Sequence, residues 1–246
     1  MVFRGEHLPV EIISDDRLDT FVPIKGRSIY VTAEGSILST LNPAIPSFPL
    51  TPATKVLIRM DGVVGLFNDI AAPAIYLNST TLITNYSVTI GATGTVFADR
   101  GSNKAVVFLG YNARFTNHGD TQGGVSITGN LAANPADIAT YPIHFDNSGT
   151  ISARYGAVNL TGRNVEANNS GTITNHGLIA SGPGGSAAID ISGGGSDTLR
   201  NFGTIDGLIA LGFCNDTFRN TGLVTGSSAW ATMTTFSTAV AARSRE

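Results

Sequence analysis

The chain has 246 residues, a length that fits one elongated domain or two compact ones. Charged residues make up only 13% of the chain and the formal net charge is −3, so we expect no nucleic-acid partner. Its single cysteine, Cys214, excludes an intrachain disulfide framework, and no apolar run is long enough for a membrane span.

Residues 1–56 differ from the rest and are predicted to form an N-terminal cap followed by a Pro-rich loop. Ser28–Ala33 alternates apolar and polar residues as a half-buried strand does. The prolines after it disfavour helix interiors and central strands: Pro43, Pro46, Pro49 and Pro52. A cap is expected because an open end coil would present unpaired backbone groups to other molecules. Met1–Pro9 lacks the apolar run of a secretory leader, so no cleavable signal peptide is predicted.

Residues 57–226 are predicted to form a β-solenoid, because Asn-x-Gly triplets recur there. Leaving aside one close pair, they recur every 19 to 30 residues, which is about one coil of a parallel β-solenoid. The triplets are Asn117–Gly119, Asn147–Gly149, Asn169–Gly171, Asn175–Gly177, Asn201–Gly203 and Asn220–Gly222.

Each coil is expected to contain three short strands with alternating inward and outward side chains. One strand follows the triplet, as in Gly149–Ala153, and a second is aliphatic, as in Ala188–Ile191. The third runs into the next corner, as in Thr81–Asn85 and Thr217–Asn220. The corner asparagine tolerates a left-handed backbone and can hydrogen-bond its stacked equivalents, while the glycine removes a Cβ clash.

Residues 227–246 are predicted to be a C-terminal cap or tail, since the pattern stops at about residue 226. Ser227–Phe236 contains the only tryptophan, Trp230, and matches no repeat. Ala239–Arg243 has the composition of a short helix. The segment either covers the last coil or binds a partner outside the chain.

A repeated five-residue motif supports a family resemblance over roughly residues 62–226. Asn147–Ile151 and Asn169–Ile173 both read Asn-Ser-Gly-Thr-Ile, and Asn201–Ile205 is a third copy with one change. These units resemble the passenger β-helices of autotransporter adhesins and large secreted bacterial repeat proteins. The resemblance implies an all-β fold, a right-handed single-stranded parallel β-helix, in an extracellular protein of adhesion, matrix formation or defence. Neither the long signal sequence nor the outer-membrane barrel of autotransporters is predicted from these residues.

A second resemblance concerns calcium. Gly193–Leu199 and Leu211–Phe218 are similar to degenerate copies of the Gly-Gly-x-Gly-x-Asp-x-Leu repeat of leaderless, calcium-binding nonapeptide proteins. It implies calcium ligation by Asp197 and Asp216, because this hard cation takes many oxygen ligands. Cys214 stands at a glycine position of the repeat, and the alternative is that each aspartate caps a turn. No other metal and no cofactor is predicted.

No catalytic residue is predicted. Glycoside hydrolysis requires two carboxyl groups about 5–10 Å apart, and the candidates on adjacent coils are Asp146, Glu166 and Asp190. Since cationic partners for a uronate do not align with them, we interpret them as solvated surface groups. Cys214 lacks a nearby histidine motif and is interpreted as a turn or core residue.

Other outward residues are weaker candidates. His118 and His176 occupy equivalent corner positions, with Ser148 and Ser170 between them, and are interpreted as exposed corner residues. Thr150, Thr172 and Thr204 recur at one strand position, but Leu178 and Leu223 interrupt the array that ice binding would need. Phe202, Tyr111 and Tyr155 could stack on sugar rings, and Asn130–Asp137 is predicted to project as a loop.

The sequence therefore predicts a β-helix of six to eight coils, roughly 30–40 Å long. The preferred function is a non-enzymatic structural or adhesive protein of a bacterial surface, an extracellular matrix or a phage-like particle. It would bind surface glycans or associate with itself as a homo-oligomer, such as a trimer, or as a filament. The alternatives are a tailspike-type depolymerase or lyase, and a fibre or spike component of a virion-like particle.

Overall fold

The computed structural model describes the chain in fourteen segments. They cover residues 10–21, 27–40, 43–46, 55–67, 72–78, 85–98, 104–109, 113–129, 143–162, 171–182, 187–192, 196–212, 215–226 and 235–238. All regular elements within these segments are β-strands. No helix among them has the length and apolar character to cross a membrane.

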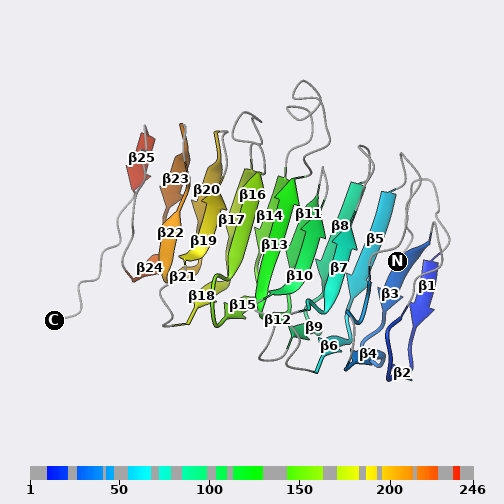
Figure 1. Ribbon diagram of the computed structural model, residues 1–246. Helices are drawn as coiled ribbons and strands as arrows, with labels where there is room; N and C mark the ends of the chain where they lie inside the picture. Colours follow the sequence, from blue (N-terminus) through cyan, green and yellow to red (C-terminus); the bar gives the residue numbers. More distant parts are fainter. Residues whose placement is uncertain are drawn as a thin grey trace.

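The strands form three sheets, and every pair of neighbours is parallel (Figure 1). Sheet A contains, in spatial order, β1 (Val10–Ile13), β3 (Ser28–Val31), β5 (Lys55–Met60), β8 (Asn85–Ile90), β11 (Arg114–Asn117), β14 (Ile143–Asn147), β17 (Gly171–Asn175), β20 (Thr198–Asn201), β23 (Thr217–Asn220) and β25 (Thr235–Thr238). Sheet B contains β2 (Asp16–Arg17), β4 (Ser36–Ser39), β6 (Val63–Leu66), β9 (Thr95–Ala98), β12 (Asp120–Gln122), β15 (Thr150–Ala153), β18 (Leu178–Ser181), β21 (Thr204–Asp206) and β24 (Leu223–Thr225). Sheet C contains β7 (Ile75–Asn78), β10 (Lys104–Leu109), β13 (Gly124–Gly129), β16 (Val158–Gly162), β19 (Ala187–Ser192) and β22 (Leu208–Ala210).

Successive coils contribute one strand each to sheets A and B and, from β7 to β22, one to sheet C, so the fold is a parallel β-helix, as predicted. Sheet A has ten strands, which at the usual strand spacing gives a rod roughly 43 Å long. This is slightly longer than the expected rod, because strands at both ends of the chain join the sheet.

The N-terminal boundary predicted at residue 57 does not separate two architectures. Strands β1 and β3 pair in parallel within sheet A, and β3 pairs with β5. Sheet B likewise begins with β2 and β4. The coils therefore start by residue 10, and the N-terminal coils carry no Asn-x-Gly triplet that would mark them in the sequence.

One further strand prediction is wrong, and one strand lies in the segment predicted as a C-terminal cap or tail. β25 pairs with β23 in the register Thr217↔Thr235, so the segment after residue 226 supplies another strand of sheet A. Asn85 is the first residue of β8, which continues to Ile90, so it does not stand at a corner. Residues 81–84, Trp230 and Ala239–Arg243 lie outside the described segments.

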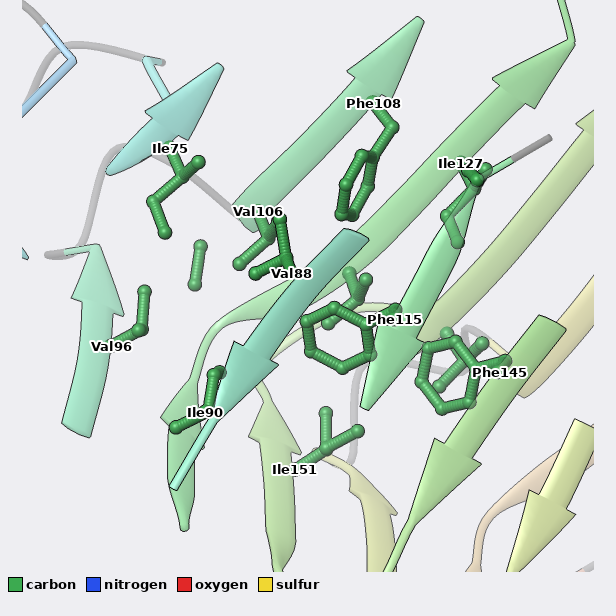
Figure 2. Close-up of a cluster of buried hydrophobic side chains, with 14 of the residues drawn as sticks. Ile75, Val88, Ile90, Val96, Val106, Phe108, Phe115, Ile127, Phe145 and Ile151 are labelled. Atoms are coloured by element: carbon green, nitrogen blue, oxygen red, sulfur yellow. The ribbon is translucent and has the colours of Figure 1, made fainter. Parts of the chain in front are cut away.

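The core is a set of continuous columns of inward side chains, one per strand position. One column of sheet A runs through Ile29, Ile58, Val88, Phe115, Phe145, Ile173, Leu199 and Phe218, all buried. Figure 2 shows two of these rings, Phe115 and Phe145, side by side, with centroids 5.0 Å apart. Phe108 of sheet C meets Phe115 edge-on at 6.2 Å. Since every coil packs on the next, no coil has a separate core.

Candidate functional site

Five corner asparagines form a buried ladder along the bend between sheets A and B. Each Nδ2 donates to Oδ1 of the asparagine in the following coil, and all four distances are 2.8 Å. The residues are Asn117, Asn147, Asn175, Asn201 and Asn220. The first four are buried, and their Nδ2 groups also donate to a backbone oxygen of the next coil. These side chains therefore hold neighbouring coils together from the inside.

The glycine of each triplet stacks on the bend glycine of the preceding coil. A Cβ atom on Gly119, Gly149, Gly177, Gly203 or Gly222 would lie 2.0–2.2 Å from that glycine's carbonyl oxygen. None of the five has a left-handed backbone; in the described chain that conformation occurs at Gly123, Gly156, Gly207, Gly212 and Gly226. Glycine is required at the corners because the coils approach closely, and the reversal itself does not require it.

The sixth triplet, Asn169–Gly171, does not belong to this column. Gly171 is the first residue of β17 and pairs with Ile143. Thr172 and Ile173 therefore align with His144 and Phe145, whereas the sequence match had aligned them with Thr150 and Ile151. Asn169 itself lies outside the described residues.

The ladder begins where the same column changes from aliphatic to amide side chains. The equivalents of Asn117 in the N-terminal coils are Ile13, Val31, Met60 and Ile90. Thr121, which is fully buried, donates its hydroxyl to Oδ1 of Asn117 at 3.4 Å. It stands between Val96 and Ile151 in an otherwise aliphatic column of sheet B. Sequence reasoning missed Thr121, although a lone hydroxyl among aliphatic repeat positions is a usable signal.

The two aspartates proposed as calcium ligands point into the interior. Asp197 and Asp216 are 3% and 1% exposed. Asp197 Oδ1 accepts the backbone N–H of Gly171 at 2.6 Å, and Asp216 Oδ1 accepts that of Asp197 at 2.9 Å. Burial raises the pKa of Asp197 to about 7, and burial also raises the pKa of Asp216.

This arrangement does not fit a calcium site among the described residues. One oxygen of each carboxylate is used by a backbone amide, and only Asp216 Oδ2 is buried without a partner. Calcium takes six to eight oxygens, and no group of three His, Cys, Asp or Glu side chains suited to a metal occurs in the described segments. The contacts correspond to the capping alternative, with each aspartate capping the backbone of the preceding coil.

The outer face of sheet A carries polar side chains in two adjacent columns near the C-terminal end. Thr172, Thr198 and Thr217 are consecutive in one column, and Thr174, Arg200 and Arg219 are consecutive in the other. We call these six residues the sheet A strip. Both arginines are exposed. The repeated wording Thr-x-Arg-Asn at residues 198–201 and 217–220 is the sequence signal that could have found them.

The threonine column expected on one strand position is wrong. Thr150 and Thr204 lie in sheet B and are separated by Leu178, whereas Thr172 lies in sheet A. The uninterrupted threonine column is the one in the sheet A strip.

Sheet C carries a second polar group on its outer face. Lys104 Nζ donates to the backbone oxygen of Gly156 at 3.1 Å, two coils further along. Burial lowers the pKa of Lys104 and raises that of Asp190, and each charge partly offsets the shift of the other. Asp190 lies beside Asn159, whose Oδ1 accepts the hydroxyl of Thr161.

The three candidate carboxylates do not gather on one face. Asp146 faces outward from sheet A and Asp190 from sheet C, and Glu166 lies outside the described residues. The expectation that the chain has no catalytic carboxylate pair stays a prediction.

The middle residues of the corner triplets form an exposed column. His118 Nδ1 lies 2.6 Å from Ser148 Oγ, and the His176 ring stacks on Phe202 with centroids 4.6 Å apart. Only Ser148 stands between the histidines in this column, so they are two coils apart. Tyr155 packs under the Arg154 guanidinium. Ser170, Tyr111, Cys214 and Asn130–Asp137 lie outside the described residues.

Comparison with known proteins returns no match: no family model, no curated protein and no solved structure is significantly similar to the chain. The fold and its bend therefore define the class on their own. The chain is a parallel β-helix repeat protein with an asparagine ladder at one corner.

Proposed function

We propose that this β-helix is a stiff, non-enzymatic adhesive scaffold of a bacterial surface, an extracellular matrix or a phage-like particle, and that it binds glycans along its side. The observation that carries the proposal is the unbroken ladder from Asn117 to Asn220, stacked beside the glycine column. Buried, fully bonded polar columns fix the register of the coils.

A fixed register sets the spacing of everything on the outer surface. Residues one coil apart are held about 4.8 Å from each other along the rod. A polymeric ligand lying along the axis can then meet several equivalent side chains, and weak single contacts add up to useful avidity. The proposed location, outside the cell or on a particle, follows the resemblance to secreted repeat proteins.

Binding without cleavage tests the proposal. Binding of the purified chain is measured on immobilised capsular and plant polysaccharides, and the length of the same polymers is measured after incubation with the chain in solution. We expect binding to one or more polymers and an unchanged size-exclusion profile of each. Shortening of a bound polymer would show a depolymerase and reject the scaffold proposal. Light scattering in the same buffer gives the oligomeric state. A trimer would favour the alternative of a spike component of a virion-like particle.

One observation favours the enzymatic alternative. Lys104 and Asp190 are partly buried on sheet C. Burial lowers the pKa of Lys104 and raises the pKa of Asp190, so it favours the neutral form of each side chain. An acidic and a basic side chain with shifted pKa values occur together at active sites as well as in structural ion pairs. If a polymer is shortened, Lys104→Met and Asp190→Asn should each remove that activity, whereas exposed Arg154→Gln should not.

A further inference from the structure

We infer that the sheet A strip binds the carboxylate groups of an acidic polysaccharide, with Arg200 and Arg219 as the charged contacts. The inference rests on the proposed function and narrows its ligand to one chemical class.

The two arginines are direct neighbours across coils. Arg200 and Arg219 are Cα partners in strands β20 and β23, and both side chains point outward. Their backbones are therefore about 4.8 Å apart. Figure 1 shows these strands side by side near the C-terminal end of the rod. Two guanidinium groups can thus act on one ligand together.

Neither guanidinium has a partner in the described chain. No hydrogen bond, ion pair or ring contact involves Arg200 or Arg219 there. Arg59, on the N-terminal part of the same face, is paired with Asp61 at 3.0 Å. Like charges directly opposite on neighbouring strands destabilise a sheet, so an added anion would relieve repulsion that the protein itself leaves unbalanced.

The chemistry of the strip favours a carboxylated glycan. A guanidinium forms two parallel N–H···O bonds with a planar carboxylate. The neighbouring hydroxyls of Thr198 and Thr217 can donate to and accept from sugar hydroxyls. Asp146 lies two coils away in the arginine column and can accept a sugar hydroxyl, but it repels dense anions.

Denser polyanions fit less well. The whole chain has a net charge of −3, so long-range attraction for nucleic acid is absent. The same charge opposes heavily sulfated glycans. A polymer with one carboxylate per sugar gains the local arginine contacts with the least long-range repulsion.

Binding to four immobilised polymers tests the inference: polygalacturonate, dextran sulfate, neutral dextran and duplex DNA. The test variant is Arg200→Gln with Arg219→Gln. The control is Arg17→Gln with Arg154→Gln, which removes the same charge from half-exposed Arg17 and exposed Arg154, both outside the strip. Thermal unfolding of both variants checks that the fold is intact.

We expect the wild type to prefer polygalacturonate, and the test variant to bind it about tenfold or more weakly, as loss of charge-assisted hydrogen bonds predicts. The control variant should stay within about twofold of the wild type, since both variants carry the same net charge. Raising the salt concentration should weaken binding of the wild type and control.

Three results would overturn the inference. The test variant could bind as tightly as the wild type, both double variants could weaken equally, or dextran sulfate or DNA could be the preferred polymer. If the wild type binds neutral dextran but not polygalacturonate, the strip is rejected while the adhesive scaffold stands. If the wild type binds no glycan in this set or in the wider panel, both proposals fail.

Discussion

The hydroxyl of Thr121 donates to Oδ1 of Asn117, and this one bond closes the N-terminal end of the asparagine ladder. Without it, the first amide oxygen would face the aliphatic column below, where Ile90 occupies the equivalent position. A buried acceptor with no donor costs about 1–3 kcal/mol.

Thr121→Val should therefore destabilise the protein although valine matches threonine in shape. We expect a loss of about 1–2 kcal/mol in the free energy of unfolding, measured by urea denaturation. Thr150→Val, on the outward side of β15, is the control and should change stability by less than about 0.5 kcal/mol. Equal effects of the two changes would contradict the role given to Thr121.

Asn175→Leu tests the ladder at its centre. The change removes the asparagine acceptor of Asn147 Nδ2, which keeps its bond to the Leu178 backbone oxygen, and it removes the donor to Asn201 Oδ1. The loss of two hydrogen bonds between buried amides predicts a loss of about 2–5 kcal/mol in the free energy of unfolding. Asn220→Leu at the half-exposed end of the ladder should lower the free energy of unfolding by less, because water can replace part of the lost hydrogen bonding. A larger effect at Asn220 than at Asn175 would argue against the ladder as the main element that fixes the register.

Gly177→Ala tests the close approach of successive bends. The new Cβ atom would lie 2.0 Å from the carbonyl oxygen of Gly149, so the two coils must separate locally. Overpacking of this kind costs about 1–3 kcal/mol, and the melting temperature should fall accordingly. Ser148→Ala, at an exposed position of the preceding bend, is the control. A stable Gly177→Ala protein with native hydrogen exchange at the bend would refute this account.

Asp197 predicts a pH dependence of unusual sign. Its folded pKa of about 7 lies above the ordinary aspartate value, so the folded chain retains a proton that the unfolded chain has lost. The stability is fully present below about pH 4 and is lost as pH rises towards 7, by up to about 4 kcal/mol. Asp216, whose pKa is also raised, contributes in the same direction.

Asp197→Asn should remove most of this dependence. The asparagine Oδ1 can still accept the Gly171 N–H, while the group no longer ionises. Urea unfolding at pH 4.5 and pH 8 should show the variant more stable than the wild type at pH 8 and similar to it at pH 4.5. Wild-type stability that rises between these two values would show that another group dominates.

The fold could be predicted from the sequence because its strongest signal is local. An Asn-x-Gly corner followed by alternating aliphatic residues marks both the bend and the strand after it, as at Asn201 and Ile205. The N-terminal coils lack that signal, since Ile13 and Met60 fill the asparagine position with aliphatic side chains. The sequence pattern therefore predicts a cap in this region.

Features that depend on register between coils could not be predicted. Asn147 and Asn169 begin the same five-residue motif. Only the pairing of Gly171 with Ile143 shows that the two motifs occupy different positions in the coil. Whether the Asp197 side chain points inward or outward likewise depends on its position in the coil. The motif Thr-x-Arg-Asn, which contains Arg200 and Arg219, occurs twice in the sequence. That the two arginines are neighbours follows only from the direct pairing of the two strands.

The four amide bonds of the ladder all point the same way, with each nitrogen donating towards the C-terminal end. Bond dipoles aligned in a row add, and each polarises the next. The ladder therefore contributes a dipole along the axis of the rod, and this dipole lies in the interior.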